Sequence, residues 1–108
     1  MLTPSVRHAL STFAEQLAAR FGERVRTLTL FGSYARGEAR EDSDVDVLVV
    51  IDGLEGAERR VVLDLAGDIF AQTDLLLSPT VYDAETWQLH TAQERPLAAS
   101  IAREGVAL

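Results

Sequence analysis

The sequence contains no cysteine and no lysine. Without cysteine there can be no disulfide, no thiolate zinc site and no cysteine nucleophile. Without lysine there can be no P-loop lysine, Schiff base or lysyl-nucleotide intermediate. All ten basic residues are arginines, so nucleotide chemistry on this chain has to be non-covalent or led by a metal ion.

Long apolar runs are also absent. None approaches the roughly 20 residues that span a bilayer, and residues 1–20 lack the basic start and apolar centre of a signal peptide. We therefore expect a cytoplasmic protein without membrane contact. The content of 47% hydrophobic and 25% charged residues is ordinary for a folded protein. A chain of 108 residues predicts a single domain over residues 1–108, with no room for a separate substrate domain.

Acidic residues outnumber basic ones, giving a formal net charge of −7 and a pI of about 4.7. A negative protein is not attracted to a nucleic-acid backbone without a local basic patch. A long nucleic-acid substrate is therefore disfavoured. A protein partner or a small substrate fits the charge better.

The order of apolar and turn residues predicts alternating helices and strands. Thr3 and Pro4 are typical of a helix N-cap and first position. The expected helices cover 4–21, a turn or short helix at 33–38, then 57–70, 83–90 and a last helix from 96. The expected strands cover 24–31, 44–51 and 73–78, the last ended by Pro79, with a terminal strand or tail at 106–108.

This order predicts an α/β (α+β) fold with a small mixed sheet of three to four strands flanked by helices. The strand at 44–51 is almost continuously Val, Leu and Ile after Asp46, which indicates a central strand buried on both faces. Tyr82 and Trp87 are expected to pack against the rest of the protein rather than to stack on a base, although exposed aromatics could instead belong to a partner interface. An open sheet edge would permit self-association, so a homo-oligomer is compatible with the sequence.

Chemistry is indicated by residues 32–47, which read GSYARGEAREDSDVDV. Side chains alternate across a strand, so Asp44 and Asp46 project from one face with Cα atoms about 6.5 Å apart. Carboxylates at this separation can share divalent cations. Two magnesium ions would require a third acid, and Asp74 is the best candidate if the strand at 73–78 lies beside 44–51.

The start of the motif is suited to phosphate. Gly32 permits close approach of the backbone, and Ser33 can donate its hydroxyl and the amides that follow it. Arg36 and Arg40 could neutralise a pyrophosphate leaving group. Arg40 belongs to a polar loop that continues through Glu41, which is expected to be solvated.

Residues 30–51 resemble the signature of the minimal nucleotidyltransferase proteins of the DNA polymerase beta superfamily, and the later TDLLL and PLAASIAREGVAL extend the resemblance over nearly the whole chain. The resemblance implies the polymerase beta-like fold. It also implies that Gly32 and Ser33 contact nucleotide phosphates and that Asp44, Asp46 and Asp74 bind magnesium, with ATP as the substrate.

The same resemblance implies a partner. Such small proteins are commonly encoded beside a helical HEPN-type toxin, and some transfer AMP from ATP to a tyrosine of that toxin with release of pyrophosphate. Two alternatives stay open at this stage. The chain could neutralise a toxin by binding alone, or it could modify a small molecule. The nucleotide preference and the number of nucleotides transferred do not follow from the sequence.

Overall fold

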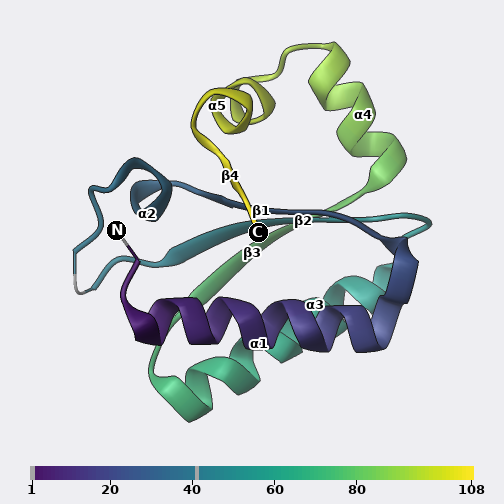
Figure 1. Ribbon diagram of the computed structural model, residues 1–108. Coiled ribbons are helices and arrows are strands. Elements are labelled where there is room, and N and C mark those ends of the chain that lie inside the picture. The colour runs from purple at the N-terminus through teal and green to yellow at the C-terminus, as the bar shows by residue number, and fades with distance from the viewer. Residues whose placement is uncertain (1, 41) are drawn as a thin grey trace.

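The computed structural model describes residues 2–40 and 42–108; Glu41, in the predicted polar loop, lies outside the described residues. A four-stranded sheet in the order β3-β2-β1-β4 forms the middle layer, with α1 and α3 on one face and α4 and α5 on the other (Figure 1). This confirms the predicted fold class. The elements are α1 (Pro4–Phe21), η1 (Gly22–Arg24), β1 (Val25–Phe31), α2 (Ser33–Arg36), β2 (Val45–Ile51), α3 (Gly56–Thr73), β3 (Leu77–Asp83), α4 (Ala84–Ala92), α5 (Pro96–Glu104) and β4 (Val106–Ala107).

The sheet is mixed. β2 runs antiparallel to β1 and parallel to β3, and the crossover between the two parallel strands is helix α3. The short β4 pairs antiparallel with the other side of β1. β2 therefore has a strand on each side and a helical layer on each face, which is why its residues are almost all buried. The predicted central strand is confirmed.

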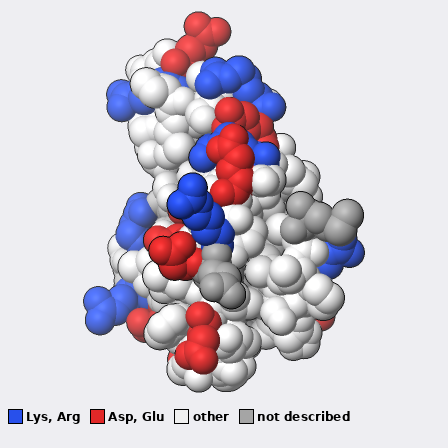
Figure 2. Space-filling view, turned by 90° about the vertical axis from the view of Figure 1, so that its left-hand side faces the viewer, with Lys and Arg blue, Asp and Glu red and all other residues white. Residues whose placement is uncertain are grey.

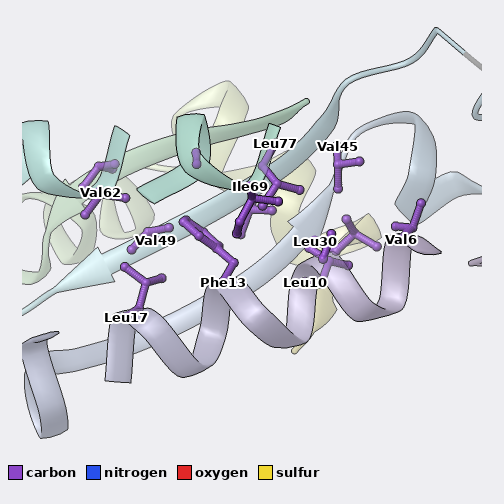
Figure 3. Packing of buried hydrophobic residues seen from close by; sticks show 14 of the residues in the cluster. Val6, Leu10, Phe13, Leu17, Leu30, Val45, Val49, Val62, Ile69 and Leu77 are labelled. Atoms are coloured by element: carbon purple, nitrogen blue, oxygen red, sulfur yellow. The ribbon is translucent and has the colours of Figure 1, made fainter. Parts of the chain in front are cut away.

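The larger core lies between the sheet and the helices α1 and α3 (Figure 3). Helix α1 begins where predicted, because the Thr3 hydroxyl accepts a hydrogen bond from the amide of Val6 at 3.2 Å. Alternation along β2 sends every second side chain into this layer. The core residues include Val6, Leu10, Phe13 and Leu17 of α1, Val45, Val47, Val49 and Ile51 of β2, and Val62, Ala66 and Ile69 of α3.

A smaller core lies on the opposite face, under α4 and α5. Leu48 and Val50 of β2 point into it and pack with Ala84 and Ile101. The rings of Tyr82 and Trp87 have centroids 5.1 Å apart at an angle of 49° and border this cluster, so their packing role is confirmed. Asp46 precedes Leu48 on the same face of β2. The smaller core thus stops short of the end of the sheet at which Asp46 lies.

The predicted strand at 73–78 is wrong. Helix α3 continues through Thr73, and β3 begins only at Leu77 and runs to Asp83. Pro79 lies inside this strand because β3 is at the sheet edge. The carbonyl of Leu76 accepts a hydrogen bond from the amide of Val45 in β2. Backbone groups of successive residues point to alternate sides of a strand, so the backbone nitrogen of Pro79, three residues later, points away from β2. No amide donor is needed on that side, because it is the edge of the sheet.

Across the described ranges, no helix is both long enough and apolar enough to cross a membrane.

Candidate active site

The predicted motif comes together at the end of the sheet where β1 stops and β2 starts. The two strands are antiparallel, and Phe31 at the end of β1 pairs with Asp46 near the start of β2. Gly32 follows Phe31 directly and leads into α2, which lies beyond this end of the sheet (Figure 1). Residues separated by a polar loop in sequence therefore become neighbours through strand pairing.

Gly32 lies directly against the carboxylate of Asp46. Its φ of 73° and ψ of −155° belong to a region that only glycine adopts readily. A Cβ on Gly32 would overlap Oδ2 of Asp46 and would lie 3.1 Å from its Cγ. The sequence predicted this glycine for its approach to phosphate. In the folded chain its backbone conformation already favours glycine, and a Cβ would in addition displace the Asp46 side chain.

Helix α2 is a single turn that begins at Ser33. The amide of Arg36 donates to the carbonyl of Gly32 at 3.2 Å, and the amide of Glu38 donates to the carbonyl of Ser33 at 2.9 Å. Tyr34 packs against the larger core, which anchors the turn. The amides at the start of a helical turn have no acceptor within it, so those that follow Gly32 can donate to a ligand.

The charged side chains of Asp44, Asp46 and Arg36 influence one another at this end of the sheet. The pKa of Asp46 is raised, mainly by its partial burial, next by the negative charge of Asp44, and the nearby Arg36 opposes the shift. Asp44 is exposed and immediately precedes β2, while Asp46 is half-buried within it. The two predicted acids and the predicted arginine are therefore close enough to interact electrostatically.

Arg36 is held by two carboxylates. Its Nε lies 3.2 Å from Oε2 of Glu38, and its Nη1 lies 3.5 Å from Oε2 of Glu104 at the end of α5. Both acids raise the pKa of Arg36, Glu38 more than Glu104. Sequence reasoning missed Glu104, because a helix-end acid 68 residues away carries no local signal of this contact.

Gly105, which follows α5, packs closely against the end of that helix and against β1. A Cβ on this residue would lie 2.6 Å from the carbonyl oxygen of Ile101 and 2.7 Å from Cγ2 of Thr29. The absence of a side chain lets the end of α5 pack closely against β1, which places Glu104 beside Arg36. Arg40, by contrast, is exposed, and its amide donates to Oγ of Ser43 at 2.8 Å.

Asp74 lies in the turn that ends α3. It is the exposed C-cap residue of α3, with a φ of 61°, and its amide donates to the carbonyl of Phe70 at 2.8 Å. Within residues 2–40 and 42–108, no three His, Cys, Asp or Glu side chains are grouped so that they could hold a metal ion. The structure thus does not assemble the predicted group of Asp44, Asp46 and Asp74. The β3 residue paired with Asp46 is Ser78.

Figure 2 shows the molecule from the end at which α2 lies. Arginine and acidic side chains stand next to one another on this face, and neither sign covers a continuous area. This mixture agrees with the ion pairs of Arg36. It does not resemble the basic surface that binds a nucleic-acid backbone.

Comparison with known proteins identifies the family of this sequence. The sequence profile of the nucleotidyltransferase domain matches residues 10–89. A Methanocaldococcus jannaschii protein provisionally named protein adenylyltransferase MJ0141 is 31% identical over 74 residues, covering 68% of this chain and 75% of that protein. The protein adenylyltransferase MntA of Thermococcus cleftensis is 52% identical over 50 residues, covering 45% of this chain and 48% of that protein.

The fold agrees with the sequence relationship. The crystal structure of a toxin-antitoxin with AMP-PNP superimposes with a TM-score of 0.55 at 20% identity, covering 88% of this chain and 68% of that chain. The likeness supports the mixed sheet flanked by helices. The predicted resemblance and the prediction of a nucleotidyltransferase are confirmed by the profile and the relatives. This chain belongs to the nucleotidyltransferase domain family.

Proposed function

We propose that this protein transfers AMP from ATP to a tyrosine of a HEPN-type toxin in the cytoplasm and thereby acts as the toxin's antitoxin. The observation that carries the proposal is the packing of Gly32 against the Asp46 carboxylate. It places a backbone suited to phosphate beside a carboxylate suited to a cation. A nucleoside triphosphate requires both at the same point.

The donor set fits magnesium. Asp44 raises the pKa of Asp46, so two carboxylates repel each other here and a cation would relieve the repulsion. Magnesium is usually bound by one or two protein carboxylates, with phosphate oxygens and water completing its octahedron. When bound, such an ion would neutralise phosphate charge and lower the pKa of an attacking hydroxyl. Asp44 and Asp46 are the residues that would hold it.

The remaining site residues divide between phosphate contact and charge neutralisation. Gly32 and Ser33 would present backbone and hydroxyl donors to the triphosphate. Arg36, held at this end of the sheet by its two acids, would face the leaving pyrophosphate, and Arg40 would reach it from the loop. Asp74 could take part as a third ligand for a second magnesium ion only if the turn between α3 and β3 rearranged.

A protein acceptor is supported by the relatives. Proteins similar to this chain carry the name protein adenylyltransferase, and one structure of the same fold is a toxin-antitoxin. The described residues form one layered unit, and α2 and the start of β2 lie at one end of its sheet (Figure 1). An acceptor hydroxyl would then be delivered by another molecule.

The test combines the purified chain with magnesium, ATP and the toxin encoded beside it, and measures the intact mass of the toxin. Transfer of AMP should add one nucleotide mass or a multiple of it to a tyrosine. Asp44→Asn and Asp46→Asn should abolish the addition. Asp68→Asn is the matched control, because Asp68 is an exposed acid of α3 that is not among the proposed site residues.

A second experiment separates catalysis from binding. Cells that express the toxin should be protected by the native chain and by Asp68→Asn, but not by Asp46→Asn. If Asp46→Asn protects as well as the native chain and no mass is added in vitro, neutralisation occurs by binding alone and the proposal of an enzyme is wrong.

A further inference from the structure

We propose that Ser78 occupies the third position beside Asp44 and Asp46, so that this chain binds a single divalent cation with two carboxylates instead of two cations with three. The inference rests on the proposed nucleotide site. It concerns which residue completes the cation-binding side of that site, and it disagrees with the three-carboxylate group that the resemblance implies.

Strand register places Ser78 next to Asp46. The two residues are partners in the parallel pairing of β2 with β3, and the bond from the Val45 amide to the Leu76 carbonyl, at 2.9 Å, fixes that pairing at the same end. Paired residues of neighbouring strands project from the same face of a sheet, about 4.8 Å apart. Ser78 is half-buried, as is Asp46. A side chain at position 78 is therefore the β3 neighbour of Asp46 on the same face of the sheet, on the side opposite Gly32.

Asp74 is held away from this position by the turn that ends α3. Its own amide is bonded to the Phe70 carbonyl. The Thr73 hydroxyl donates to the carbonyl of Ile69 at 2.6 Å and accepts from the amide of Leu75 at 3.1 Å, and Leu75 also packs against the larger core. Moving Asp74 into the sheet would break these contacts on both of its sides.

The charge of the site follows from this assignment. Two carboxylates carry the charge that one divalent cation neutralises, and a second cation would lack a carboxylate of its own. The Ser78 hydroxyl is a neutral oxygen donor, which can bind the cation or one of its water ligands. Cation affinity in carboxylate sites rises with the number of charged ligands. A carboxylate at position 78 should therefore strengthen binding.

The experiment measures Mn²⁺ binding by electron paramagnetic resonance in the presence of AMP-PNP, without any turnover. We expect one Mn²⁺ per native chain. Asp74→Asn should leave the affinity within about twofold of the native value, Ser78→Ala should weaken it by a few-fold, and Ser78→Asp should strengthen it about tenfold. Asp68→Asn is the matched control for the loss of one acid on α3.

The outcomes distinguish this inference from the proposed function. If Asp74→Asn weakens Mn²⁺ binding as much as Asp46→Asn does, or removes a second bound ion, Asp74 is the third ligand and the inference is overturned. If Asp44→Asn and Asp46→Asn also leave Mn²⁺ binding unchanged, the proposed site itself is wrong. Thermal unfolding of each variant identifies any loss of folding, and the Asp74→Asn result decides the question even if Ser78→Asp does not fold.

Discussion

Asp46 and Glu58 are both acids close to the ends of regular elements, but their pKa values shift in opposite directions. Partial burial and the charge of Asp44 raise the pKa of Asp46. The hydrogen bond from Arg24 lowers the pKa of Glu58 to about 2, with help from the amide of Glu55. Asp44 and Asp46 at the start of β2 therefore repel each other, while Glu58 at the start of α3 is paired with Arg24.

Glu58 and Arg24 form a cluster of hydrogen bonds that joins three elements. Arg24 donates to both oxygens of Glu58, at 2.8 and 2.7 Å, and to the carbonyls of Asp52 and Gly53 at 3.0 and 2.9 Å. Glu58 also accepts from the amide of Glu55 in the capping box of α3. This cluster ties the start of β1 to the end of β2 and the start of α3. It stabilises the scaffold, whereas the charges around Asp46 belong to the proposed ligand site.

The largest expected effect is that of Gly32→Ala, which should abolish transfer, by more than about 100-fold, because it displaces the Asp46 carboxylate. It should also destabilise the fold by about 1–3 kcal/mol through backbone strain. The comparison variant is Gly37→Ala, which has the same φ of 73° but lies in the less strained left-handed helical region, with no atom within 4 Å of the added Cβ. Equal activity in the two variants would show that displacement of the Asp46 carboxylate does not affect transfer. Transfer rates and thermal unfolding measure both effects.

Asp46→Asn should also lose activity but gain stability at pH 7. The pKa of Asp46 is raised from 3.8, so the stability that this group contributes is present below that value and is lost as the pH rises through its folded-state pKa. The ionised carboxylate is thus unfavourable at neutral pH, and the neutral amide removes that cost. The melting temperature without metal should rise by a few degrees, and the gain should shrink below pH 4. If Asp46→Asn melted at a lower temperature than the native protein at pH 7, the ionised Asp46 carboxylate would not be unfavourable in the folded state.

Thr3→Ala should cost about 1 kcal/mol and leave transfer unchanged, because it removes only the cap that accepts from the Val6 amide. Chemical denaturation measures the loss. Ser11→Ala on the exposed side of the same helix is the control and should not destabilise. A loss of activity in Thr3→Ala would mean that the start of α1 contributes to the site as well as to the scaffold.

Glu58→Gln should have the smallest effect, because water screens its exposed partner Arg24. The lowered pKa means that the stability from Glu58 is present above its ordinary value of 4.5 and is lost as the pH falls through about 2. The variant should melt below the native protein at pH 7, and the difference should disappear between pH 4.5 and 2. Glu15→Gln on α1 is the control. A difference that persists below pH 2 would show that packing, not charge, is lost.

The boundary between α3 and β3 shows where sequence reasoning failed. A run of apolar residues after Asp74 is compatible with a strand that begins there, and Pro79 is a plausible end. In the structure the helix continues to Thr73, the chain turns through Asp74 with a positive φ, and Pro79 is accommodated inside an edge strand. Local propensity does not reveal which strands are at an edge, so the register of β3 could not be predicted.

The sequence by itself determined most of the elements, the central strand and the positions of Gly32, Ser33, Asp44 and Asp46, because these depend on local periodicity and on a motif contained within 16 residues. The tertiary structure alone decided which distant residues join them. It brought Glu104 to Arg36 and Ser78 to Asp46, and it left Asp74 outside. Contacts between elements depend on strand register and helix ends, where a shift of a few residues changes which side chain faces the site.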